Sequence, residues 1–535
     1  MESRPGLRAT VPSHAGQRHS WWLHGLLAIL WAGCMIGPDY HRPPTMVQTS
    51  WVEKGSPALD TSHQQYRDWW QVFNDPLLTE LINLTYAHNL TVQAAGARVL
   101  EERAQLGEAL GELYPQQQTL SAGLNYNRLP VTLPFKLFNN QFWEDTFEVQ
   151  AGWELDLWGK IRRGIQSADD NYLGAVANYD EVLVTTTGDV ASTYVEIRTI
   201  QQQLQYARAN VVVERQSLAI AQARYEGGVV TQRDVDQAQN VLATTQAAIP
   251  QLQAQLQQSE DALAVLLGIT PAAASDLVGA NGPIPTAPLR AAVGIPADLL
   301  RRRPDLRLAE LQAAAQCAQI GVAKADLLPA LTLVGNLGTI ATTVVGGSLD
   351  SVFNGQSLAW AAGPSLSWSI LNYGQITNNV RYQDARFQEL LIDYQNAVLK
   401  AQQEVENGLA SFVAARRQVF YQTRAVRAAA DALAIANTQY AQGTVDFTTV
   451  LTAEQNLYES QNSLAIANGA VPLGLIATYR ALGGGWQLRL GHDFLPAQTR
   501  AEMTARTNWG AISRPQAPGL PGPGDQGGLV RPPEF

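Results

Sequence analysis

The sequence predicts a mainly α-helical, internally duplicated chain that also carries β-strands of the kind found in membrane β-barrels. Three observations predict this fold class. Two stretches of about 180 residues repeat one another. Each contains a long segment with apolar residues at every seventh position, and each contains two weakly alternating segments of about ten residues or more.

The duplication begins in a short, well-matched motif. Residues 104–115, "AQLGEALGELYP", align with residues 318–329, "AQIGVAKADLLP", at an offset of 214 positions. Farther along the chain the offset is 215, so that Trp153 matches Trp368. A constant offset over such a distance predicts that one structural unit is built twice.

A coiled-coil helix is predicted in each copy by its apolar heptad positions. These are Val190, Ile197, Leu204, Val211, Leu218 and Tyr225 in the first copy and Val405, Phe412, Val419, Val426, Leu433 and Tyr440 in the second. Such a run favours a coiled coil, the alternative being a long globular amphipathic helix. The proline-free stretch 160–224 would extend for roughly 100 Å as a helix.

Each long helix is predicted to turn and return as a hairpin. Gly228 and Gly443 suit the left-handed residue that ends a helix. The return helices would run to Gly268 and Gly483, and Pro250 is expected to kink the first of them.

Between the helices the apolar period falls to two. The segments are "QQQTLSAGLNYNR" (116–128), "FEVQAGWELDLWG" (147–159), "ALTLVGNLGTIATTVV" (330–345) and "LAWAAGPSLSWSILNYG" (358–374). Weak alternation with aromatic residues near the ends is typical of outer-membrane strands, the alternative being a soluble hairpin buried in its own domain. Because the smallest membrane barrel has about eight strands, four strands that cross a membrane require several chains to share one barrel.

The N-terminus has the pattern of a secretory signal. Three arginines precede an apolar run at 21–32, which is too short to span a bilayer. The small residues Ala32 and Gly33 then precede Cys34, as in a lipoprotein signal, although Trp31 stands where leucine is usual. Cys34 is therefore the predicted lipidation site, the alternative being a plain signal with an incidental cysteine. Met35 after the cysteine fits export onward to the outer membrane.

Composition narrows the possible functions further. Removal of residues 1–33 takes away three arginines and one glutamate, so the formal charge of −10 becomes −12, and no basic patch points to nucleic acid. The sequence contains no nucleophile motif, no metal-ligand spacing and no nucleotide-binding loop. We therefore expect a protein without enzymatic activity, bound metal or cofactor. Cys317 is expected to be a small buried apolar residue, with a reactive thiol as the alternative. The run Gly483-Gly484-Gly485 is expected to end a helix and turn the chain.

The sequence also resembles a known family. The motifs are "CMIGPDYHRPP" (34–44), "RRRPDLRLAE" (301–310), "IGVAKADLLPALTL" (320–333), "GTVDFTTVLTAEQNL" (443–457) and "YRALGGGW" (479–486). They resemble the TolC-like outer membrane efflux proteins, and in particular the lipoprotein (NodT- and OprM-like) branch that serves RND-type pumps. The resemblance implies a homotrimer: four strands per chain form a shared 12-stranded outer-membrane barrel, and the long hairpins form a periplasmic α-barrel.

The resemblance further implies an outer-membrane channel of a tripartite efflux system, lipid-anchored and with a long periplasmic extension. Its partners would be an inner-membrane RND-type pump, a periplasmic adaptor and outer-membrane lipid. The adaptor and pump would dock at the hairpin tips, for which the candidate residues are Gly228, Val229, Val230, Thr231, Gly443, Thr444, Val445 and Asp446. Drugs or other small molecules would pass through it passively, but the sequence names neither the substrate nor the pump.

The resemblance also implies a periplasmic gate on the second hairpin. Close relatives carry aspartate in a motif "LLDAQ", whereas this chain reads "VLTAEQ" and places Thr452 at that position. Candidate gate residues are Thr448, Thr452, Asp446 and Asp234. The narrowest part of the gate would then be either a ring of carboxylates or a neutral constriction of hydroxyl groups.

These features predict an order of segments along the chain. It comprises a lipoprotein signal peptide (1–33), an N-terminal equatorial segment (34–80), a first repeat (81–268, with strands about 116–158 and a hairpin about 160–268), an equatorial linker (269–300), a second repeat (301–483, with strands about 330–373 and a hairpin about 375–483), a C-terminal equatorial segment (484–513) and a disordered Pro/Gly-rich tail (514–535). Three alternative functions remain besides an efflux channel: a type I protein-secretion duct, a periplasmic coiled-coil scaffold lipoprotein, and a surface enzyme on a helical stalk.

Overall fold

The computed structural model describes residues 35–60, 66–130, 140–288, 290–294, 302–344 and 347–513. Cys34, the predicted signal peptide and the tail from residue 514 lie outside these ranges. The chain divides into two compact units, each assembled from segments that are far apart in sequence. The first unit contains Gln105–Asp170, Ala314–Gln388 and the described residues up to His41. The second contains Arg42–Ala104, Asn171–Ala313 and the described residues from Glu389 onward.

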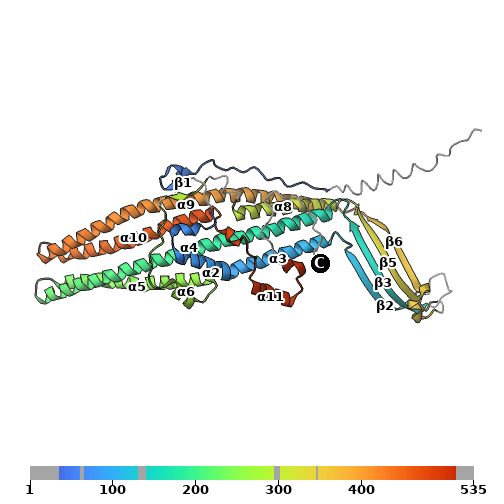
Figure 1. Ribbon diagram of the computed structural model, residues 1–535, viewed down its shortest axis with the longest axis horizontal. Coiled ribbons are helices and arrows are strands. Elements are labelled where there is room, and N and C mark those ends of the chain that lie inside the picture. Colours follow the sequence, from blue (N-terminus) through green and yellow to red (C-terminus); the bar gives the residue numbers. More distant parts are fainter. Residues whose placement is uncertain are drawn as a thin grey trace, which may run out of the picture. The chain divides into compact units, whose positions relative to one another are not determined.

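The first unit is built on a four-stranded antiparallel sheet. Its strands are β2 (Gln117–Arg128), β3 (Gln141–Leu155), β5 (Ala330–Thr342) and β6 (Leu358–Ser367), in the order β2-β3-β5-β6 (Figure 1). Two 3₁₀ turns, η3 (Leu349–Phe353) and η4 (Gly355–Ser357), lie between β5 and β6 in the chain. Because the sheet is open, β2 and β6 each keep one edge unpaired within the described chain.

Most of the described residues are helical, as predicted. The helices are α2 (Pro76–His88), α3 (Leu90–Gly111), α4 (Lys160–Glu226), α5 (Gln232–Leu267), α6 (Pro271–Val278), α8 (Pro304–Ala325), α9 (Gln375–Ala441), α10 (Phe447–Ala481) and α11 (Ala497–Arg506). Short 3₁₀ turns add η1 (Val52–Gly55), η2 (Trp69–Phe73), η5 (Trp486–Arg489) and η6 (Gly510–Ser513). The short strands β1 (Leu59–Asp60) and β4 (Ala291–Ala292) pair in parallel.

Two long helices dominate the chain, since α4 and α9 have 67 residues each. Five of the six predicted heptad residues of α4 are buried, but Tyr225 at its end is 46% exposed. In α9 four of the six are buried, whereas Val419 and Val426 are half-buried. The apolar stripe is therefore packed along most of each helix. The return helix α5 contains Pro250 within its bounds.

The core of the second unit is aromatic and draws on the segment before the first repeat. Trp69 stacks on Tyr479 with ring centroids 5.7 Å apart, and Trp51 and Trp70 are almost fully buried with them. The glycine run after α10 fits closely against this cluster. A Cβ on Gly484 would lie 2.9 Å from a Trp69 ring atom, so the chain can turn there only without a side chain.

Candidate functional site

The four-stranded sheet has one predominantly apolar face. The strand register brings these residues to it: Leu120, Ala122, Leu124 and Tyr126 of β2, Trp143, Phe147, Val149, Ala151 and Trp153 of β3, Leu331, Leu333 and Leu337 of β5, and Leu358, Trp360, Ala362, Pro364 and Leu366 of β6. Polar residues on this face include Gln118, Asp145 and Thr339. Trp360 is 73% exposed and Leu120 is 65% exposed. An exposed apolar face of this extent is one that lipid or another apolar surface would cover.

The opposite face of the same sheet is polar. It carries Gln117, Thr119, Ser121, Asn125 and Asn127 of β2, Glu144, Thr146, Glu148, Gln150 and Glu154 of β3, Thr332, Asn336 and Thr342 of β5, and Ser365 and Ser367 of β6, together with a few apolar residues. The Glu148 carboxylate accepts hydrogen bonds from Asn336 (2.6 Å) and Gln150 (3.0 Å). The paired positions of this face include glutamates but neither lysine nor arginine, so the face is polar and acidic.

Tryptophans mark the end of the sheet at which the chain passes into helices. The indole N–H groups of Trp153, Trp158 and Trp368 each donate to a backbone carbonyl, at distances of 3.1, 2.8 and 3.0 Å. Tryptophan with an apolar ring and a satisfied N–H is characteristic of membrane–water interfaces.

The first described residues of the chain are anchored at the same place. The Ile36 N–H donates to the Trp158 carbonyl at 3.0 Å. The Arg163 side chain donates to the Ile36 carbonyl at 3.3 Å and to Asp39 at 2.8 Å. The predicted lipidation site Cys34 lies outside the described residues, but it precedes this anchored segment directly. The first described residues therefore lie close to the tryptophan-marked end of the sheet.

Cys317 packs as a buried residue of α8. Its side chain is 1% exposed, and its thiol lies 3.5 Å from the Pro38 carbonyl. Burial raises the pKa of the thiol, which favours its neutral form over the nucleophilic thiolate. This placement agrees with the expectation of a small buried apolar residue.

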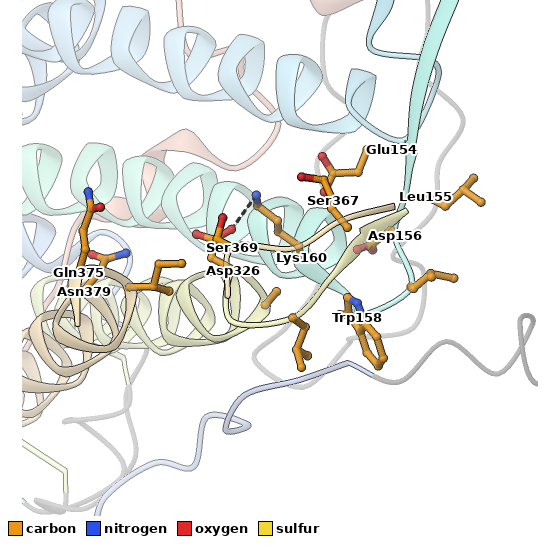
Figure 2. Close-up of a pocket in the computed structure, with 15 residues that line it drawn as sticks. Glu154, Leu155, Asp156, Trp158, Lys160, Asp326, Ser367, Ser369, Gln375 and Asn379 are labelled. Carbon is orange, nitrogen blue, oxygen red and sulfur yellow. Dashed lines mark ion pairs between the residues drawn. The ribbon is translucent and has the colours of Figure 1, made fainter. Parts of the chain in front are cut away.

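A cavity of about 390 Å³ lies where the strands of the first unit join its helices (Figure 2). Its lining includes Glu154 and Ser367 from the polar face of the sheet, and Lys160 at the start of α4. Lys160 forms an ion pair with Asp326 at 2.8 Å. Burial opposes the charge of Lys160, but its hydrogen bond to Asp326 and the nearby carboxylates raise its pKa overall. The cavity therefore has a mixed polar and apolar lining, and Glu154 and Ser367 connect it to the acidic face.

The predicted first tip is a tight, exposed turn between α4 and α5. Gly228 has φ +70°, and the N–H groups of Gly228 and Val229 donate to the carbonyls of Tyr225 and Arg224, both at 2.9 Å. These two hydrogen bonds form a Schellman motif, which needs a left-handed residue at its centre. Val229 is 72% exposed, so an apolar side chain projects from the tip.

The second tip repeats this geometry at the same end of the hairpins (Figure 1). Gly443 has φ +74°, and its N–H donates to the Tyr440 carbonyl at 3.0 Å. The Thr444 N–H donates to the Gln439 carbonyl at 3.0 Å. Asp446 precedes α10 as its N-cap residue and is exposed.

The predicted gate residues separate into exposed and buried positions. Thr448 and Thr452 are both exposed on α10, and the Thr452 hydroxyl donates to the Thr448 carbonyl at 2.8 Å. Asp234 is buried, and its carboxylate accepts from the Thr231 N–H (3.0 Å) and hydroxyl (2.9 Å). Burial opposes the charge of Asp234, but the hydrogen bonds from Thr231 lower its pKa overall. Because Asp234 caps α5, Asp446 is the more accessible of the two acids.

The two hairpins are joined by polar contacts that the sequence reading missed. Four residues of α4, spaced seven apart, each bond to the second hairpin. They are Gln203 (to Asn462, 2.6 Å), Asn210 (to Gln461, 2.7 Å), Ser217 (to Glu454) and Arg224 (to the Tyr440 carbonyl, 3.3 Å). We call this set the hairpin seam. Each member immediately precedes an apolar heptad residue in the sequence. The polar residues beside the heptad positions were therefore the available signal for this seam.

Known proteins similar to this chain define its family. The sequence profile of the outer membrane efflux proteins matches residues 81–269 and 295–484. The chain belongs to the outer membrane efflux protein family. It is 30% identical to the nodulation protein T of Rhizobium leguminosarum bv. trifolii, over 82% of this chain and 92% of that protein. It is 29% identical to the solvent efflux pump outer membrane protein SrpC of Pseudomonas putida, over 86% of this chain and 97% of that protein.

The fold of this family member is also that of solved outer-membrane channels. The outer-membrane channel OprN superposes with a TM-score of 0.78 at 30% identity, covering 85% of this chain and all of that channel. The predicted TolC-like, mainly helical fold is thereby confirmed, and the protein is located in the outer membrane.

Two further findings concern metals and membrane helices. No group of three or more histidines, cysteines or acids suited to hold a metal ion occurs in the described ranges. No single helix of the described chain is long and apolar enough to cross a membrane, but α5 and α6, bent by 105°, pass that test as a pair.

Proposed function

We propose that this efflux protein is the outer-membrane channel of a tripartite efflux system and a passive exit duct for drug-like or other small molecules. The observation that carries the proposal is the two-faced sheet, apolar on one side and acidic on the other. Such a sheet suits a wall between lipid and a water-filled lumen. Relatives that include a solvent efflux pump outer membrane protein support the same role.

The working form is proposed to be a homotrimer. Four strands are too few to close a membrane barrel, whereas three chains would supply twelve. The free edges of β2 and β6 offer the backbone groups through which neighbouring chains would pair, and pairing removes edges that are otherwise costly in lipid.

A lipid on Cys34 is proposed to hold the mature N-terminus at the membrane surface. The anchored segment beginning at Met35 supports this assignment, because the Ile36 N–H is fixed to Trp158 beside the tryptophan-marked end of the sheet. A lipid one residue before this segment would reach the bilayer that the apolar face contacts.

The two tips are proposed to dock a periplasmic adaptor and, through it, an inner-membrane RND-type pump. Both turns are Schellman motifs, and the exposed Val229 offers an apolar contact. The gate is proposed to involve Thr448, Thr452 and Asp446, which are exposed at the tip end of α10. Transport of this kind needs no covalent chemistry and no cofactor from this chain.

Accumulation of a fluorescent efflux dye in cells with and without the gene tests the proposal, with the inner-membrane energy source intact and other exit ducts removed. We expect deletion to raise accumulation and the wild-type gene to reverse the effect. A Val229→Asp variant should complement less well than Val212→Asp, a control at an exposed position of α4 away from the tip. Unchanged accumulation across several dyes would overturn the efflux role, and a simultaneous loss of protein export would point to the secretion duct.

A further inference from the structure

Two buried carboxyl groups lie beside the hairpin seam, one bonded across it and the other bonded within the first hairpin. Glu454 of α10 is 1% exposed and accepts a hydrogen bond from the Ser217 hydroxyl of α4. Glu214 of α4 is 2% exposed and accepts from the Thr245 hydroxyl of α5 at 2.8 Å. The second oxygen of each carboxyl is fully buried and has no hydrogen-bond partner among the described residues. Such groups are costly when ionised, because a buried carboxylate needs several donors or a nearby cation.

The surroundings of these carboxyls are apolar or neutral. The buried core cluster around them includes Val211, Leu218, Val241, Leu242, Leu433, Val450 and Leu451. Among the described residues, the titratable groups that interact with them are each other and Tyr458 of α10. Arg224 is the basic residue of the seam. Its side chain donates to the Tyr440 carbonyl, and its guanidinium carbon lies 4.1 Å from the centroid of the Tyr440 ring.

We propose that Glu214 and Glu454 form a proton-binding latch in the hairpin seam, which is closed while protons are bound and loosened when both groups ionise. A protonated carboxyl gains an O–H donor and loses its charge, so it fits an apolar seam with one hydroxyl partner. Two ionised carboxylates would repel each other and draw water between α4 and α10. The bound proton comes from bulk solvent and returns to it.

The sign of the pH dependence follows from the shifts of both groups. Burial raises the pKa of Glu454 and of Glu214, and the charge of Glu454 adds to the rise at Glu214. The folded seam therefore binds protons that the unfolded chain would release. Its stability is fully present below the ordinary glutamate pKa of about 4.3 and is lost as the pH rises through the raised values.

The latch would act on the proposed gate through α10. Thr452 lies two positions before Glu454 on this helix and is exposed where Glu454 is buried. Loosening the seam at Glu454 would free the part of α10 that carries Thr452. This consequence rests on the proposed function, whereas the latch itself is a property of the folded chain.

Infrared spectroscopy of the full-length lipoprotein in detergent tests proton binding directly. We expect a carboxylic-acid C=O band that persists above the ordinary glutamate pKa of about 4.3 and disappears as the pH rises further. Glu214→Gln and Glu454→Gln should each remove part of it, while Glu459→Gln, at an exposed site on α10, should not. Asp170 and Glu181, whose pKa values burial raises to about 7, supply a background band that these variants leave unchanged. Carbon-13 labelling of glutamate removes the aspartic-acid part of this background, and a labelled acid band that neither Glu214→Gln nor Glu454→Gln reduces overturns the proposal.

Amide hydrogen exchange tests the mechanical part of the latch. After correction for chemical exchange, residues 448–462 of the wild type should exchange about tenfold faster at a pH above the loss of the acid band than at a pH below it. In E214Q/E454Q, which mimics the protonated pair, exchange should stay slow at both values. A pH dependence that persists in the double variant overturns the latch. Neither readout requires transport, so failure here leaves the efflux role intact, and failure of the dye test leaves the latch intact.

Discussion

Asp180 of α4 and Arg489 of η5 form a buried ion pair although 309 positions separate them in the chain. The Arg489 Nε and Nη2 atoms lie 2.6 and 3.1 Å from the two carboxylate oxygens. Another pair of the second unit, Arg480 with Asp189, has a similar separation of 2.9 Å, but its side chains are 46% and 41% exposed. The two pairs differ mainly in burial, which makes them a matched set.

Arg489→Met is expected to destabilise the protein by about 3–5 kcal/mol, because it leaves the Asp180 carboxylate buried without its partner. Arg480→Met should cost less than about 1 kcal/mol, since water screens the exposed pair. Denaturant unfolding of the second unit, followed by hydrogen exchange, measures both variants. Equal losses for the two would show that burial does not decide the strength of these pairs.

Leu337→Lys is expected to impair insertion into the membrane. Leu337 lies at the centre of the apolar face, opposite Val149 and Trp360, and a lysine at the bilayer midplane costs about 2–4 kcal/mol. Asn336→Lys places the same charge one residue away on the polar face and should be tolerated. The yield of folded, heat-modifiable protein in outer membranes measures both. A larger defect for Asn336→Lys would mean that the lipid-facing and lumen-facing sides are reversed.

Gly228→Ala is expected to loosen the first tip, whereas Gly227→Ala should not. An alanine at Gly228 must adopt the observed φ of +70°, which costs roughly 1–2 kcal/mol. A Cβ on Gly227 would meet only ordinary contacts, the nearest at 3.5 Å from a backbone oxygen. Hydrogen exchange of residues 224–236 in the two variants tests this difference. Identical protection would indicate that the Schellman turn does not hold the tip.

Cys34→Ala is expected to abolish incorporation of a radiolabelled fatty acid and to leave the signal peptide unprocessed by the lipoprotein pathway. Cys317→Ala is the matched control, because that thiol is buried in α8 and should not accept lipid. Metabolic labelling followed by mass spectrometry of the mature N-terminus measures the outcome. Persistent label in Cys34→Ala would place the lipid elsewhere or rule it out as an anchor.

The sequence by itself determined the local architecture, because that depends on neighbours within a few turns or strand positions. The heptads of α4 and α9, the turn glycines Gly228 and Gly443 and the family motifs were all readable in this way. The weak alternation of apolar and polar residues also predicted the strands. It did not predict which side chains of the four strands would share one face of the sheet. That alignment depends on the register between strands, which brings Val149 opposite Leu337.

The tertiary structure alone decided which side chains meet across long distances. In the sequence, Glu454 is only an acidic residue displaced from the aspartate position of the gate motif. In the structure it is buried against Ser217, 237 positions away. Asp234 was a candidate for the gate, yet its carboxylate caps α5. The physical reason is that a helix exposes or buries a residue according to what packs against it, and those partners come from distant segments. A periodic pattern specifies the apolar stripe, but the charge and hydrogen bonds beside the stripe depend on the neighbour it meets.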